Sequence, residues 1–127
     1  MATVEDWIES SRSELKRAEE RYYVGDYAYA CFHAEQAIQH ILKAYLLRHG
    51  NFLRIHDLCL LYSRARAYGL ELTVSDEELR ELTIHYYASR YPDARKRYGI
   101  EYTETVAKKA IELARKVVSE VMRCLST

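Results

Sequence analysis

Apolar residues recur every three or four positions along most of this chain, which is the spacing of one face of an α-helix. The clearest such stretch runs from Gly25 to Gly50, about six helical turns with no internal Gly or Pro. The apolar stripe of this helix includes small alanine residues, which let a second helix approach closely. We therefore expect this helix at the centre of an all-helical core. Its apolar stripe comprises Tyr27, Cys31, Ala34, Ile38, Ile41 and Tyr45, widened by Ala30, Ala37 and Ala44.

Four other segments carry the apolar spacing or the end signals of helices. A first helix is expected over residues 3–23, a third up to Gly69, a fourth that fails around residues 89–91, and a last one near the C-terminus. Their starts are marked by residues that cap helices, which are Thr3, His56 or Asp57, Ser75 (with Glu78, a capping box) and Thr103.

The connections between these helices are short, with one exception. Residues 70–74 are expected to be an extended connector, and residues 88–102 to be the one long irregular segment. Pro92 ends the fourth helix, because a proline disfavours helical geometry in the residue before it. The pattern therefore predicts one domain, residues 1–127, folded as an antiparallel up-and-down bundle of four to five helices.

Charge and composition narrow the class of protein. The 19 Lys and Arg balance the 19 Asp and Glu, so any binding to nucleic acid must come from a local patch. Three dispersed cysteines without a CxxC pair indicate reduced, mostly buried thiols of an intracellular protein. Without a signal-peptide pattern or a membrane-length apolar window, we expect a cytoplasmic protein. Its many Arg, Glu and Tyr with few Asn and Gln hint at a thermophilic source.

Three stretches resemble the HEPN domain family, specifically its small stand-alone prokaryotic members. They are GDYAYACFHAEQAIQHILKAYLLRHG, then His56-Asp57-Leu58, then HYYASRYPDA from His85 to Ala94, and they occur in the family's order. The resemblance implies a helical bundle that usually forms a homodimer and is frequently encoded beside a minimal nucleotidyltransferase, as a toxin–antitoxin-like pair. Many members are metal-independent ribonucleases, whereas others act as binding or scaffolding partners, so whether this chain is an enzyme stays open.

The nuclease members carry an Arg-x4–6-His motif, and Arg80, His85 and Tyr87 match its Arg-x4-His-x-Tyr form. A histidine could move the proton of the ribose 2′-hydroxyl, and an arginine could stabilise the phosphorane charge. Two features oppose this role. Glu81 follows Arg80 and would repel phosphate, and five helical residues turn about 140°, which puts His85 on a different flank, with Glu78 and Glu81. A structural role for both residues is the alternative.

The segment around Pro92 is the best local basic and aromatic patch. Arginine and tyrosine together can hold a phosphate and stack on a base, so we expect a nucleotide- or RNA-binding surface here. The alternative is a loop pinned to the bundle by some of the same side chains. The candidate binding residues are Arg90, Arg95, Lys96, Arg97 and Tyr98.

No metal or cofactor is expected. His33 and His40 are seven residues apart, about 10 Å along a helix, which is too far to chelate one ion without other ligands. We interpret them as a polar flank of an exposed helix face or of a dimer seam. The twelve tyrosines exceed what the core needs, which favours an aromatic dimer interface.

Overall fold

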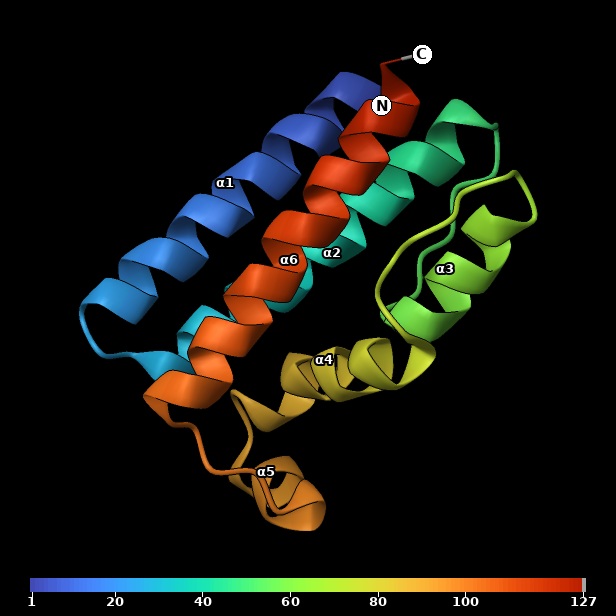
Figure 1. Ribbon diagram of the computed structural model, residues 1–127. Coiled ribbons are helices and arrows are strands. Elements are labelled where there is room, and N and C mark those ends of the chain that lie inside the picture. Colours follow the sequence, from blue (N-terminus) through green and yellow to red (C-terminus); the bar gives the residue numbers. More distant parts are fainter. Residues whose placement is uncertain (127) are drawn as a thin grey trace.

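The computed structural model describes residues 1–126, which form six helices and no strand. Three long helices, α1, α2 and α6, lie side by side (Figure 1), and α2 contacts both of the others as well as α3 and α4. The all-helical bundle is confirmed. The helices are α1 (Val4–Tyr23), α2 (Tyr27–Arg48), α3 (Leu58–Arg66), α4 (Asp76–Ala88), α5 (Pro92–Tyr98) and α6 (Glu104–Leu125).

The helix starts follow the capping signals of the sequence. Thr3 and Ser75 each form a reciprocal capping box with the acid three residues later. Asp57 accepts hydrogen bonds from the backbone amides of Cys59 and Leu60, and Thr103 accepts one from Val106. These bonds satisfy amide groups that a helix start otherwise leaves without a partner.

Small residues of α2 bring the first two helices close together. Ala30, Ala34 and Ala37 are completely buried, and the Ser11 hydroxyl of α1 donates a 2.6 Å hydrogen bond to the carbonyl of Ala37. The same packing buries Cys31, which raises the pKa of its thiol to about 12. The expectation of mostly buried thiols was wrong, because Cys59 is only half-buried and Cys124 is exposed.

The segment 88–102 is not irregular throughout, because residues 92–98 form α5. Pro92 occupies the first helical position, where its missing N–H costs nothing, and Tyr91 before it is extended. Gly99 ends the helix with a φ of 62°, in the left-handed region that favours glycine. The proline that stops α4 therefore also starts α5, at the base of the molecule in Figure 1.

Within residues 1–126, no helix combines the length and the apolar character that crossing a membrane requires.

Candidate functional site

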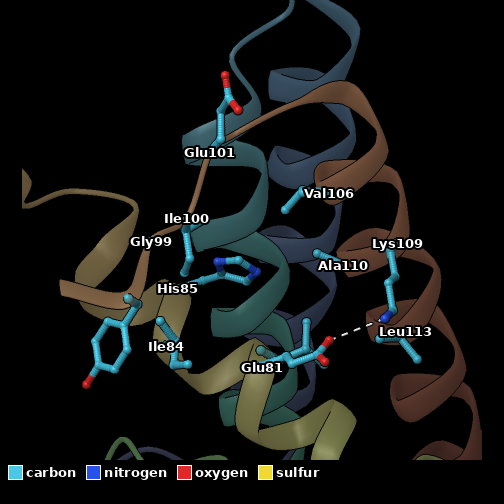
Figure 2. A pocket seen from close by; sticks show the side chains of 12 residues that line it. Glu81, Ile84, His85, Gly99, Ile100, Glu101, Val106, Lys109, Ala110 and Leu113 are labelled. Atoms are coloured by element: carbon cyan, nitrogen blue, oxygen red, sulfur yellow. Dashed lines mark hydrogen bonds and ion pairs between the residues drawn. The ribbon is translucent and has the colours of Figure 1, made fainter. Parts of the chain in front are cut away.

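A pocket of about 420 Å³ opens between α4, α6 and the segment that joins α5 to α6 (Figure 2). Most of its wall is apolar. At one side the Lys109 ammonium lies 3.2 Å from the Glu81 carboxylate and links α6 to α4. Its lining residues are Glu81, Leu82, Ile84, His85, Tyr98, Gly99, Ile100, Glu101, Val106, Lys109, Ala110 and Leu113.

His85 is the most buried ionisable side chain of this pocket, with 6% of its surface exposed. Its Nδ1 atom lies 2.8 Å from the hydroxyl of Tyr102. Burial lowers the pKa of the imidazole to about 4, and the nearby charge of Glu81 offsets this only in part. The ring is therefore neutral near pH 7.

Arg80 does not join His85 within one chain. Its side chain is exposed, and its charge acts on Cys59 of α3, where it partly offsets the rise in the thiol pKa caused by burial. His85 faces a different direction, toward α6 and the connection after α5. The helical projection placed His85 on a flank with Glu81, and in the structure both line this pocket, where His85 is buried.

Tyr87 belongs to a row of rings across the start of α2 and the end of α4. We call this row the aromatic belt, and it comprises Tyr29, Phe32, Tyr86, Tyr87 and Tyr91. Along it, neighbouring ring centroids are 6.1, 6.3, 4.8 and 6.3 Å apart. Tyr29, Tyr87 and Tyr91 keep 43%, 53% and 51% of their surface exposed. The belt is thus an accessible aromatic surface.

Arg90 holds the belt together. Its Nε and Nη2 atoms donate to the carbonyl of Tyr86 at 2.9 and 2.5 Å. Its guanidinium lies 4.6 Å from the ring centroid of Phe32, 4.7 Å from that of Tyr86 and 5.1 Å from that of Tyr91. The cation–π contacts stabilise the local arrangement, and the two hydrogen bonds to Tyr86 leave fewer donors for a ligand.

Arg95 also faces the protein. It donates from Nε to the carbonyl of Ala88 at 3.0 Å and from Nη2 to that of Ser89 at 2.8 Å, and its guanidinium lies over the ring of Tyr102. These carbonyls lie at the end of α4, where the helix cannot satisfy them itself. Arg95 therefore fastens α5 to α4.

The other three candidate binding residues are exposed. Lys96 lies on the solvent-facing side of α5. Arg97 and Tyr98 line an open hollow of about 500 Å³ together with Tyr87, Tyr91, Asp93 and Ala94. This hollow combines three aromatic rings with one cationic side chain, Arg97, and one acidic side chain, Asp93.

A buried polar network that sequence reasoning missed lies under the belt. Glu35 of α2 is completely buried and accepts hydrogen bonds from the amide nitrogens of Gln36 at 2.9 Å and Gln39 at 2.6 Å. Burial raises the pKa of Glu35 to about 8, although the two amides and the charges of Lys43 and Arg90 pull it down.

The network continues to the surface through His56. Its Nδ1 atom lies 3.4 Å from the Gln39 carbonyl oxygen, and its Nε2 atom 3.0 Å from the Tyr86 hydroxyl. The rings of His56 and Tyr86 also stack, with centroids 4.1 Å apart. Glu35, Gln39 and Lys43 repeat every four residues, so a polar row inside an apolar helix was the available signal.

His33 and His40 contact α1 instead of forming an exposed flank. Nδ1 of His33 lies 2.6 Å from the Glu14 carboxylate, and Nδ1 of His40 lies 2.8 Å from the Ser10 hydroxyl. Both are half-buried contacts of the α1–α2 hairpin. Among residues 1–126, no three His, Cys, Asp or Glu side chains are placed to hold a metal ion together.

Comparisons with known proteins agree on one family. The family model of the HEPN domain matches residues 4–124. TT1696 from Thermus thermophilus is 30% identical, with a TM-score of 0.78 over 97% of this chain and 98% of that one. ST0689, described as an archaeal HEPN homologue, is 28% identical, with a TM-score of 0.72 over 96% and 97%.

A HEPN domain protein from Thermotoga maritima shares the fold. It is 19% identical, with a TM-score of 0.70 over 94% of this chain and 97% of that one. No curated protein matches the chain.

Proposed function

Because the chain belongs to the HEPN domain family, we propose that it is a homodimeric binding protein that pairs with a minimal nucleotidyltransferase in a toxin–antitoxin-like module. The exposed aromatic belt is the observation that carries this proposal. Tyrosine and arginine dominate the energetically important centres of protein interfaces, and the belt combines three exposed tyrosines with Arg90.

The belt is suited to a protein partner because it is already ordered. Arg90 is held by the Tyr86 carbonyl and by three rings, so little side-chain freedom remains to be lost on binding. Below it, the network around Glu35 anchors Tyr86 through His56. A rigid aromatic surface of this kind supports dimerisation or capture of the nucleotidyltransferase.

The dimer is tested by measuring molar mass with light scattering after size-exclusion chromatography. The wild-type chain is expected to elute as a dimer, and the double variant Tyr87→Ser with Tyr91→Ser to dissociate at least about 100-fold more readily, since it removes four tyrosines from a symmetric interface, which together contribute at least about 3 kcal/mol. Tyr23→Ser is the matched control, because Tyr23 is 90% exposed outside the belt. A wild-type monomer at high concentration would refute this part.

Pairing with the nucleotidyltransferase is tested by co-expression with the one encoded beside the gene. The tagged wild-type chain should retain the enzyme through size-exclusion chromatography, as should the Tyr23→Ser control. Failure of the two proteins to co-purify, with both of them folded, would contradict the pairing.

We further propose that the hollow beside α5 binds a nucleotide or an RNA phosphate. Arg97 offers a charge to the phosphate, the exposed Lys96 next to it in the sequence adds to that charge, and Tyr98 offers a ring for a base. With a fluorescein-labelled RNA, Arg97→Glu with Lys96→Glu should weaken binding at least about tenfold, whereas Arg12→Glu with Lys16→Glu on the exposed face of α1, which changes the net charge by the same amount, should leave it nearly unchanged. Equal weakening by both variants would mean that only net charge matters.

A metal-independent endoribonuclease is the alternative function, supported by the Arg80-x4-His85-x-Tyr87 spacing. Within one chain the two residues are apart, so such a site needs a second copy to bring an Arg80 beside His85. The binding proposal expects RNA to stay intact in EDTA and in Mg²⁺. Cleavage that His85→Ala abolishes in a folded dimer would establish the nuclease instead.

A further inference from the structure

The pocket beside His85 shares Tyr98 with the hollow beside α5, and none of its lining residues belongs to the aromatic belt. Its walls are mainly aliphatic, from Ile84 of α4, Ile100 of the connection and Val106 and Leu113 of α6. Figure 2 shows the His85 ring between Ile100 and Ala110, with the Glu81–Lys109 ion pair at another side of the same space. At about 420 Å³, the pocket has the size at which proteins hold small molecules.

One nitrogen of His85 is available to a ligand. Nδ1 is engaged by Tyr102, and within residues 1–126 no hydrogen-bond partner is found for Nε2. Every fully enclosed side-chain nitrogen or oxygen in that part of the chain does have a partner, so Nε2 reaches open space, which here is the pocket. A polar atom on a side chain that is only 6% exposed is thus directed at an apolar cavity.

Nε2 is a hydrogen-bond donor in the tautomer in which the Tyr102 hydroxyl donates to Nδ1 of His85. The Tyr102 hydroxyl keeps its proton, since burial raises its pKa, and Nδ1 of His85 is its hydrogen-bond partner. If the hydroxyl donates to Nδ1, the hydrogen of the neutral imidazole resides on Nε2. The pocket then presents one N–H group and needs an acceptor from the ligand.

The charges around the pocket disfavour an anion. The ammonium of Lys109 is already paired with Glu81, and Glu101 adds a second carboxylate to the lining. His85 supplies no positive charge, because its imidazole is neutral. The net negative rim would therefore repel a phosphate or carboxylate, whereas it would not repel an uncharged group.

From this geometry we propose that the pocket binds a small uncharged molecule with an apolar or aromatic body and one hydrogen-bond acceptor, which receives the N–H of His85. The aliphatic walls hold the body, and the histidine orients it. This site goes beyond the proposed partner pairing and takes a chemical class different from the phosphates proposed for the hollow beside α5.

A series of probes with one shape and three charges tests the proposal. Benzamide, benzylamine and benzoate share a phenyl ring but are neutral, cationic and anionic, and each is titrated into the protein of residues 1–127, labelled at methyl groups for NMR. Benzamide should shift the methyl signals of Ile84, Ile100 and Val106. Benzoate should bind at least about tenfold more weakly, because it meets the carboxylates of the lining, and benzylamine also more weakly, because its ammonium offers no acceptor to the N–H of His85.

Two variants separate the pocket from the rest of the molecule. His85→Phe keeps a ring but removes the donor and should weaken benzamide about tenfold, and Val106→Trp should abolish binding by filling the space. Lys108→Ala, exposed on α6 outside this pocket, is the matched control and should bind normally. Unfolding curves of each variant exclude loss of fold as the cause.

Three outcomes would overturn the proposal. Benzoate that binds as tightly as benzamide would show that the pocket does not discriminate ligands by charge. Binding unaffected by Val106→Trp would show that the ligand binds outside this pocket. If no probe binds and Val106→Trp instead disrupts the dimer, the pocket receives a side chain of a second copy. None of these results depends on the nucleotidyltransferase or on RNA.

Discussion

Replacing Glu35 by Gln removes a buried acid while keeping its size and most of its hydrogen bonding. In the folded chain this carboxyl is completely enclosed and lies between the amides of Gln36 and Gln39. Its pKa rises from the ordinary value of 4.5 to about 8, chiefly because burial penalises the charged form. The substitution therefore tests whether the Glu35 carboxyl beneath the aromatic belt is neutral or charged at pH 7.

The sign of the effect follows from proton binding. Since the folded state holds the proton more tightly than the unfolded chain, the stabilisation from Glu35 is complete below pH 4.5 and is lost as the pH rises toward 8. Between about pH 5 and pH 7 the wild-type protein should lose about 2.5 kcal/mol that the Glu35→Gln variant keeps. The variant loses about 1 kcal/mol at every pH, because one amide group faces another.

The assay is urea unfolding followed by circular dichroism at several pH values. The free energy of unfolding of the variant minus that of the wild type should rise with pH by about 2.5 kcal/mol over this range. Other groups titrate equally in both proteins and cancel. Glu9→Gln, on the exposed face of α1, is the control and should show no such trend. Parallel curves for Glu35→Gln and the wild type would refute the neutral buried acid.

Two further predictions concern the pocket and its border. The low pKa of His85, about 4 instead of 6.5, means that the unfolded chain binds the proton first, so stability falls as the pH drops from 6.5 toward 4. His85→Gln should remove about 3 kcal/mol of this dependence in the same unfolding assay, and an unchanged slope would contradict burial of a neutral ring. Gly99→Ala should destabilise the protein by about 1 kcal/mol in thermal unfolding, because φ is 62° there although no atom obstructs a Cβ. An unchanged melting temperature would refute that strain.

Local signals in the sequence identified most helix starts. The caps at Thr3, Ser75 and Thr103 depend on hydrogen bonds between residues three positions apart, so nearby sequence is sufficient to predict them. Pro92 was interpreted only as the end of α4. Its second role as the first residue of α5 was also a local signal, because proline at this position with glycine after the helix is a known pattern.

The candidate site depended on residues far apart in the chain. The motifs behind the family resemblance placed Gln39, His56 and Arg90 in three separate segments, and only folding brings them around Glu35 and Tyr86. A glutamate on a helix is usually solvated, so its sequence position did not reveal burial. Glu35 is enclosed because α2 contacts helices on several sides.

The spacing of apolar residues by itself determined that the chain is helical and that α2 is its centre, because that periodicity reports which face of each helix is buried. Only the tertiary structure decided the orientation of the polar side chains. It turned Arg95 toward the end of α4, left Arg97 exposed and covered His85 with α6. The partners of the polar side chains depend on which helices pack together, and helical spacing does not encode that choice.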